Sequence, residues 1–268
     1  MYPNELFLGM TLYDVFLALG VISALMIFNY FSRKRGLEGK LHNFILVDTV
    51  LSVVLGYVSA VLVQELWNSL EKGKYELSGS SGATFLGGLL GGAAVFLSFY
   101  FIAGGFVFKD GLHKRRIASL LDIAAVCIPS AHAFGRIGCL SAGCCYGRKT
   151  TAWYGIKMVD LGYKVVPLQL FESIFLFGLF IVLFILCKKK IHGLLPIYMI
   201  VYGLWRIPIE FLRDDHRGNS FVSFLTPSQF VSVLLIVGGV ALWFFLRAYW
   251  KKHSGKNIGK KLAAEKTN

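Results

Sequence analysis

The chain places an arginine where a charge is costly. Arg136 follows an apolar run and lies in the stretch Gly135-Arg136-Ile137-Gly138, which we expect to form a glycine-rich turn at the end of a membrane-embedded helix. Ionisable side chains at the edge of hydrocarbon are rare and usually mark a functional site. A guanidinium presents a planar fork of donors that matches the oxygens of a phosphate or carboxylate. The sequence therefore predicts that Arg136 belongs to a functional site.

A second set of charges falls near the end of a later apolar run. Arg206, Glu210 and Arg213 are spaced i, i+4 and i+7, so a helix places them on one face. Two interpretations are open. The three side chains form either a structural ladder of ion pairs or a cationic cradle for an anionic head group, with Glu210 orienting one guanidinium. Arg206 is the deeper residue, so interfacial snorkelling explains it less well.

Polar residues on two other predicted helices complete the candidate set. Gln169 and Glu172 are one helical turn apart at the start of an apolar run. Glu172 either caps that helix through the macrodipole or pairs with Arg136 or Arg206 inside the bundle. His132 precedes Arg136 by four residues and shares its face if the helix continues. It either bonds to a neighbouring helix or transfers a proton, for which histidine is best suited near neutral pH.

Three cysteines follow the arginine stretch with the spacing C-x4-C-C. Cys139, Cys144 and Cys145 lie in a segment that we expect to face outward, where thiols can oxidise. The spacing matches no established zinc template, so the sequence predicts no metal site and no cofactor. A disulfide stays open, and small packing residues are the simplest interpretation. Cys127 and Cys187 lie within apolar runs and are expected to be buried and inert.

The composition is that of a polytopic helical membrane protein. Of the 268 residues, 56% are hydrophobic and only 16% are charged, which is too apolar for a soluble domain of this size. Seven apolar runs are long enough to span a bilayer. They cover residues 10–31, 43–67, 83–107, 117–134, 168–187, 193–211 and 228–250. We therefore expect an all-α fold with a single transmembrane domain over residues 1–250, a basic cytoplasmic tail at 251–268 and no cleavable signal peptide.

The placement of positive charge indicates a topology. A net charge of +13 would suit nucleic acid, but most of the 28 Lys and Arg residues follow the first, third, fifth and seventh runs, on one side of the membrane. The positive-inside rule then places the N-terminus outside and the tail inside, against anionic lipid. No nucleic-acid partner is expected. The segments at about 68–82, 135–167 and 212–227 then face outward, so we expect chemistry at the outer leaflet.

Three further features constrain the packing. The glycines at 87–92 allow helix backbones to approach closely. Residues 150–166 form either a short strand or an amphipathic arm at the interface. Asp14, Asp48 and Asp122 lie within or at the ends of apolar runs, where a carboxylate should be paired or protonated, but the sequence indicates no partner for them.

These motifs together resemble the prolipoprotein diacylglyceryl transferases of bacterial membranes, described by a Gly-Arg-x-Gly-Asn-Phe-x-Asn-x-Glu-x-x-Gly stretch. The matching positions are Gly135, Arg136, Gly138 and Gly147. The Gln169-Leu170-Phe171-Glu172 segment is similar to the family's Ser-Gln-Leu-Tyr-Glu segment. The stretch from Tyr202 through Arg206 and Glu210 to Arg213 is similar to its late arginine helix. Phe85 with Gly87-Gly88-Leu89 is similar to its Phe-His-Gly-Gly stretch, and Tyr13 to an early tyrosine.

The chain departs from the family pattern beside the arginines. Leu86 stands where members carry a histidine before the paired glycines. Cys139, Ala142 and Cys144 stand where the long motif has two asparagines and a glutamate. The arginine-bearing stretch near the second run is not evident around 56–58. The residues expected to face a phosphate are kept, while many of their polar neighbours are replaced.

The resemblance implies transfer of a diacylglyceryl group from phosphatidylglycerol to the lipobox cysteine of a preprolipoprotein, with glycerol phosphate as the leaving group. Arg136 and Arg206 would stabilise the phosphate as charge develops on it. With Leu86 unable to act as a base, His132 is the expected replacement, unless the field of the arginines alone lowers the pKa of the acceptor thiol. The residues expected to bind substrate are Arg136, Arg206, Glu210, Arg213, Gln169, Glu172, Tyr13 and Gly138.

Two other functions keep the same fold and lipid site. The acceptor could be another thiol, a hydroxyl or a glycan, or the chain could be a non-catalytic relative that binds lipid or lipoprotein. In each case the resemblance implies a multi-pass protein of the bacterial plasma membrane. The expected partners are phosphatidylglycerol, lipobox peptides and the bilayer.

Overall fold

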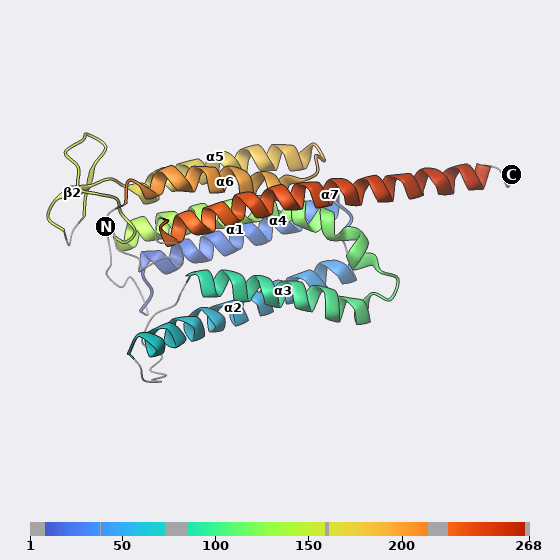
Figure 1. Cartoon of the computed structure of the whole chain (residues 1–268), viewed down its shortest axis with the longest axis horizontal. Helices are drawn as coiled ribbons and strands as arrows, with labels where there is room; N and C mark the ends of the chain where they lie inside the picture. Colours follow the sequence, from blue (N-terminus) through green and yellow to red (C-terminus); the bar gives the residue numbers. More distant parts are fainter. Residues whose placement is uncertain (1–8, 38, 73–84, 159–160, 214–224, 266–268) are drawn as a thin grey trace. The chain divides into compact units, whose positions relative to one another are not determined.

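The computed structural model describes residues 9–37, 39–72, 85–158, 161–213 and 225–265, and these are mainly helical (Figure 1). This confirms the predicted all-α class. The elements in chain order are α1 (Leu12–Lys34), α2 (Lys40–Lys72), α3 (Phe85–Val107), α4 (Leu112–Ala142), β1 (Ile156–Lys157), β2 (Lys164–Val165), α5 (Leu168–Lys188), α6 (Leu194–Glu210) and α7 (Pro227–Glu265).

Six of the described helices are long and apolar enough to cross a membrane, namely α1 to α5 and α7. Helix α6 has 17 residues. At a rise of 1.5 Å per residue it measures about 26 Å, which is near the lower limit for a bilayer core. The predicted multi-pass architecture is confirmed, while the count of seven spans and the N-terminus-out orientation stay predictions.

The helices divide into two compact units, Ser32–Ile117 and the remainder, Met1–Phe31 with Ala118–Asn268. In the smaller unit α2 and α3 pack side by side through glycine. A Cβ on Gly56 would lie 3.0 Å from the Cα of Gly92, and Ser59 Oγ donates a hydrogen bond to the Gly87 carbonyl at 3.0 Å. The predicted close approach of backbones at 87–92 is confirmed.

The larger unit gathers α1, α4, α5, α6 and α7 (Figure 1). Small residues again set the distances between helices. A Cβ on Gly20 of α1 would lie 3.0 Å from the Ala131 carbonyl oxygen of α4, and one on Gly203 of α6 would lie 2.9 Å from the Ser232 carbonyl oxygen of α7. Helix α7 continues to Glu265, so the basic tail begins as an extension of this helix.

Helix α4 corrects one prediction. It continues past the expected end at residue 134 to Ala142, so the predicted turn around Arg136 is wrong, and Gly135 and Gly138 are helical. The glycines are tolerated because α1 packs against this face. A Cβ on Gly138 would lie 3.1 Å from Tyr13 Cδ2. The outward segment predicted from residue 135 therefore starts after Ala142.

The segment between α4 and α5 ends in a hairpin, in which β1 pairs antiparallel with β2. The strand alternative is thus confirmed for these residues. Upstream of it, the Gly147 amide donates to the Val166 carbonyl at 2.8 Å and the Arg148 amide to the Leu212 carbonyl at 2.9 Å. These bonds hold the end of α6 and the start of α5 against the segment that follows α4.

Asp122 finds a partner that the sequence did not indicate. Its Oδ1 accepts hydrogen bonds from the backbone amides of Gly193 at 2.9 Å and Leu194 at 3.0 Å, and its Oδ2 lies 2.8 Å from His192 Nδ1. The carboxylate of one helix therefore caps the positive end of α6. The other two aspartates bond locally, Asp14 to Thr11 and Asp48 to Ser52.

Some sequence predictions lie outside the described residues. Helix α2 continues to Lys72, so the segment predicted at 68–82 begins as helix, and its part from 73 onward is not described. Residues 214–224, within the segment predicted at 212–227, are also not described. Leu86 lies in the first turn of α3, but its side chain belongs to the undescribed part.

Candidate active site

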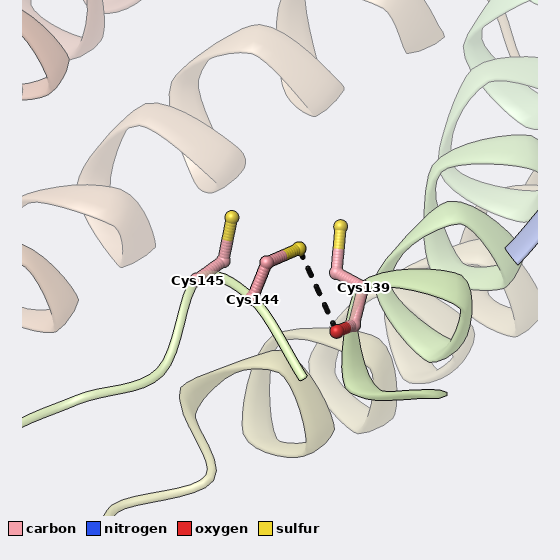
Figure 2. Close-up of side chains that lie close together, drawn as sticks. All are labelled: Cys139, Cys144 and Cys145. Carbon is pink, nitrogen blue, oxygen red and sulfur yellow. Dashed lines mark hydrogen bonds between the residues drawn. The ribbon is translucent and has the colours of Figure 1, made fainter. Parts of the chain in front are cut away.

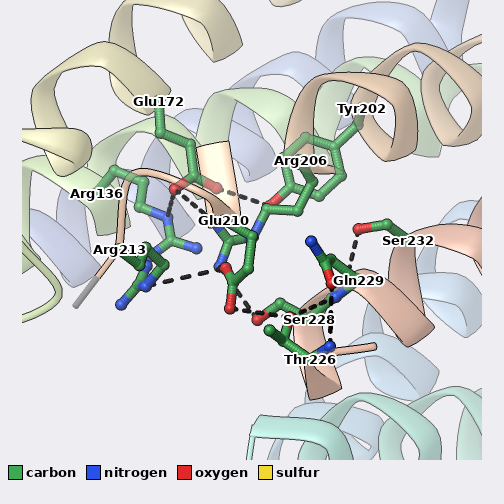
Figure 3. Close-up of polar contacts among 10 residues, drawn as sticks. All are labelled: Arg136, Glu172, Tyr202, Arg206, Glu210, Arg213, Thr226, Ser228, Gln229 and Ser232. Carbon is green, nitrogen blue, oxygen red and sulfur yellow. Dashed lines mark hydrogen bonds and ion pairs between the residues drawn. The ribbon is translucent and has the colours of Figure 1, made fainter. Parts of the chain in front are cut away.

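Three arginines and two glutamates meet within the larger unit (Figure 3). We call this set the arginine network. Its members are Arg136 of α4, Glu172 of α5, Arg206 and Glu210 of α6, and Arg213 just past the end of α6. Five of the residues predicted from sequence to bind substrate thus lie together in space.

Glu172 lies at the centre of the network and is 1% exposed. Its Oε2 is 3.1 Å from Arg136 Nε and 3.9 Å from Arg206 Nη1. The hydroxyl of Tyr202 donates to its Oε1 at 2.8 Å. The pairing interpretation of Glu172 is confirmed over the capping one, because the carboxylate joins α4 to α6 across α5.

Glu210 holds the second guanidinium from the other side. Its Oε2 lies 2.8 Å from Arg206 Nη2 and 3.9 Å from Arg213 Nε. Arg206 Nη2 also donates to Ser228 Oγ at 3.2 Å, and the Thr226 hydroxyl donates to Glu210 Oε1 at 3.2 Å. The shared face that the i, i+4 and i+7 spacing predicted is confirmed by these ion pairs, which fit both the structural ladder and the head-group cradle. Ser228 and Thr226 were not predicted, since small hydroxyl residues at a helix start carry no spacing signal of their own.

One guanidinium nitrogen of the network lacks a hydrogen-bond acceptor among the described residues. Arg206 Nη1 is buried, lies 3.9 Å from Glu172 Oε2 and makes no hydrogen bond there. Buried donors are costly unless an acceptor satisfies them. The arrangement therefore suits a bound anion.

His132 lies one turn before Arg136 on the same face of α4, because the helix continues through both residues. Its ring packs edge-on against Tyr202, with 5.2 Å between ring centroids. The histidine thus contacts the same tyrosine that holds Glu172. The predicted sharing of a helix face by His132 and Arg136 is confirmed.

The remaining candidates lie beside the network, towards the end of α4. Gln169 is buried, and its side-chain amide donates to the Cys144 carbonyl rather than to an arginine partner. Tyr13 packs against Gly138. These contacts associate Gln169, Tyr13 and Gly138 with the cysteine-bearing segment.

Fold and site together define a polytopic membrane protein in which a buried arginine, Arg206, and a half-buried one, Arg136, meet at a buried glutamate. The family model for prolipoprotein diacylglyceryl transferase matches residues 5–245, and the chain belongs to this family. It is therefore a membrane transferase of lipoprotein biosynthesis, as the sequence motifs predicted.

Curated relatives match along nearly the whole chain. A phosphatidylglycerol–prolipoprotein diacylglyceryl transferase 2 of Clostridium perfringens (strain 13 / Type A) is 32% identical over 254 residues, which cover 91% of this chain and 94% of the relative. An enzyme of Clostridium tetani with the corresponding name is 29% identical, over 85% of this chain and 90% of its own. One from Campylobacter curvus is 30% identical, over 90% and 91%.

Proposed function

We propose that this chain transfers the diacylglyceryl group of phosphatidylglycerol to the lipobox cysteine thiol of a prolipoprotein. A thioether forms and glycerol phosphate leaves. The names of the relatives support both substrates. The single structural observation that carries the proposal is the convergence of Arg136 and Arg206 on the buried Glu172, with Arg206 Nη1 left without a hydrogen-bond acceptor among the described residues.

The lipid phosphate suits the network. A phosphodiester carries one negative charge, and its oxygens would accept a hydrogen bond from the buried Arg206 Nη1. When the carbon–oxygen bond breaks, the phosphate becomes a monoester and gains a second negative charge. Fixed guanidinium donors in a water-poor site favour that change. Arg136 and Arg206 are the proposed catalytic pair.

The other polar groups of the site have holding roles in this proposal. Glu172 and Glu210 orient the guanidiniums, and Tyr202 fixes Glu172 through its 2.8 Å hydrogen bond. Arg213 adds charge at the end of α6. Gln169, Tyr13 and Gly138 would border the path of the acceptor peptide, because they lie where the cysteine-bearing segment begins.

The acceptor thiol must lose a proton, since a thiol with a pKa near 8.5 is only about 3% thiolate at pH 7. We propose that His132 accepts this proton when the thiol reaches the arginines still protonated. Its place one turn from Arg136 supports the role. The active site is proposed to lie towards the outer leaflet, with the N-terminus outside, because the basic segments follow alternate helices.

The proposal is tested with the purified full chain in detergent, phosphatidylglycerol and a lipobox peptide, with the peptide mass as readout. We expect a gain equal to one diacylglyceryl group, which Arg136→Ala and Arg206→Ala abolish. Arg115→Ala is the matched control, because its guanidinium is exposed and pairs with the exposed Asp110. Lipid binding without any mass gain would contradict the reaction and favour another acceptor or a non-catalytic relative.

A further inference from the structure

Three cysteines come together in the structure, and two of them, Cys139 and Cys144, stand where the family pattern has polar residues (Figure 2). Cys139 lies near the end of α4, and Cys144 and Cys145 lie in the turn that follows. The three Sγ atoms are all within 4.8 Å of one another. We call this set the cysteine cluster.

The distances suit a single thiophilic cation. Thiolates around a tetrahedral zinc ion, with zinc–sulfur bonds of about 2.3 Å, are separated by about 3.8 Å. The observed limit of 4.8 Å is within reach of that value by small side-chain rotations. A disulfide would use two of the sulfurs and leave the third, whereas a metal ion uses all three. No disulfide joins the cysteines of the described chain.

Contacts from outside the cluster hold its backbone in place. Gln169 of α5 is buried and donates a hydrogen bond to the Cys144 carbonyl. The Cys144 amide donates to the Cys139 carbonyl at 3.1 Å. Cys145 has a φ of 64°, a left-handed conformation that few non-glycine residues adopt. The Cys144 thiol also donates to the Cys139 carbonyl at 3.7 Å, so backbone and side-chain bonds together bring the three sulfurs close to one another (Figure 2).

One side of the cluster is open. Cys144 is exposed, and Cys139 and Cys145 are half-buried. Structural zinc sites close with four protein ligands, whereas catalytic sites have three and leave the fourth position for water or substrate. Within the described chain the cluster contains three ligands and no His, Asp or Glu among them. The ligand count is that of a site with a vacant fourth position.

The cluster lies next to the arginine network. Arg136 and Cys139 are three residues apart on α4, which is less than one turn and about 4.5 Å along the helix axis. On α5, Gln169 bonds to the cluster and Glu172, one turn later, pairs with Arg136. A group held at the cluster would thus lie close to a phosphate held by Arg136. Three thiolates with one divalent cation carry a net charge of minus one, which complements the network.

We propose that Cys139, Cys144 and Cys145 bind a zinc ion whose fourth ligand is the lipobox cysteine thiol of the acceptor. The inference rests on the proposed function and adds how its nucleophile is formed. A thiol that coordinates zinc is deprotonated outright. The site therefore supplies a thiolate, in place of the polar residues that this chain lacks.

The transfer conserves atoms, protons and electrons. On coordination the acceptor thiol releases its proton to water at the exposed side of the cluster. The sulfur then forms a bond to the glyceryl carbon, and the bond from that carbon to the phosphate oxygen breaks with its electron pair on the oxygen. Glycerol phosphate leaves with two negative charges against the arginines, and the thioether product binds zinc more weakly than the thiolate did. The zinc ion undergoes no change of oxidation state.

The metal content is the first test. The full chain is purified in detergent with a reductant, incubated with zinc chloride and dialysed, and its zinc is measured by mass spectrometry. We expect about one zinc per chain in the wild type and loss of zinc in Cys139→Ser and Cys144→Ser. Cys187→Ser is the matched control, because this cysteine is buried within α5 and should leave the zinc content unchanged. A zinc-free wild type, or zinc retained by Cys139→Ser, would overturn the inference.

The fourth ligand is tested by cobalt substitution in the wild-type chain, which does not depend on any variant folding. A lipobox peptide with cysteine should change the thiolate-to-cobalt absorption, and the same peptide with serine should not. Equal spectra with the two peptides would overturn the assignment of the acceptor thiol as ligand.

Activity separates this inference from the proposed function. Removing zinc with a chelator should lower kcat/KM at pH 7 by about 30-fold, the ratio of a complete thiolate to the roughly 3% present in a free thiol, and added zinc should restore it. A wild type that is active and zinc-free leaves the proposed function standing and overturns this inference. A wild type that binds zinc and the cysteine peptide without forming thioether overturns the proposed function and leaves the zinc site standing.

Discussion

The arginine network and the cysteine cluster are neighbours on α4 and are built in opposite ways. The network lies between helices and is buried, with Glu172 and Glu210 paired to guanidiniums from other elements or turns. The cluster lies at a helix end and in a turn, and one of its thiols is exposed. The difference corresponds to two tasks. The helices hold the guanidiniums of the network in fixed positions. The cysteine cluster needs an open side if a second substrate is to reach it.

The largest expected effect comes from removing a charge of the network. Arg136→Ala should lower kcat/KM by about 10³-fold, because the leaving phosphate loses a fixed donor. The cluster should still bind zinc, since its ligands lie outside the substituted position. Thioether formation and zinc content, measured on the same preparation with Arg115→Ala as control, check both statements. A loss smaller than about tenfold would remove Arg136 from the catalytic pair.

His132→Gln tests whether the thiolate forms at His132 beside the arginine network or at the cysteine cluster. In the chelated chain we expect turnover at pH 7 to fall by about 10²-fold, because the proposed proton acceptor is lost. In the zinc-loaded chain we expect turnover within about threefold of the wild type, because the metal has already removed the proton. Turnover of both forms is measured side by side. Near-normal turnover in the chelated variant would show that His132 is not the proton acceptor.

Gln169→Leu should affect the cluster and spare the network. The substitution removes the amide that bonds to the Cys144 carbonyl, a contact behind the ligands. Such supporting contacts typically change metal affinity between about 10- and 100-fold. We expect weaker zinc binding of that size with unchanged binding of phosphatidylglycerol. Gln64→Leu, on α2 of the smaller unit, is the control. Weaker lipid binding with normal zinc affinity would assign Gln169 to the network instead.

Tyr202→Phe tests the rigidity of the network. The loss of the hydrogen bond to Glu172 should cost about 1.5 kcal/mol, and so lower turnover by about tenfold. Tyr198→Phe is the matched control, because its ring stacks on Tyr202 while the hydroxyl that donates to Glu172 belongs to Tyr202. Kinetics at fixed lipid concentration measure the effect. Equal losses in the two variants would mean that ring packing, rather than the hydroxyl, is what matters.

Asp122→Asn should have the smallest effect on activity. Asp122 caps α6 and pairs with His192, and neither residue belongs to the network or the cluster. We expect about 2 kcal/mol of lost stability, seen as a lower melting temperature in detergent, with normal turnover at low temperature. Asp110→Asn, at an exposed pair, is the control. A marked loss of turnover at low temperature would show that the cap of α6 also positions Arg206.

Local patterns were sufficient for part of this protein. The helical class followed from long apolar runs, because hydropathy is read residue by residue. The shared face of Arg206, Glu210 and Arg213 followed from i, i+4 and i+7 spacing, since a helix repeats every 3.6 residues. The pairing of Glu172 was one of two open interpretations. Choosing between them required the position of α5 relative to α4 and α6.

The sequence by itself therefore determined that an arginine-bearing site lies within a bundle of membrane helices. Only the tertiary structure decided three things about that site. Helix α4 continues past Arg136 because α1 packs against Gly138. Tyr202 and Ser228 complete the network because α6 packs against both α5 and α7. The sulfurs of Cys139, Cys144 and Cys145 meet in a turn whose Cys144 carbonyl accepts a hydrogen bond from Gln169 of α5. Each depends on contacts between segments distant in the chain, which a local pattern does not encode.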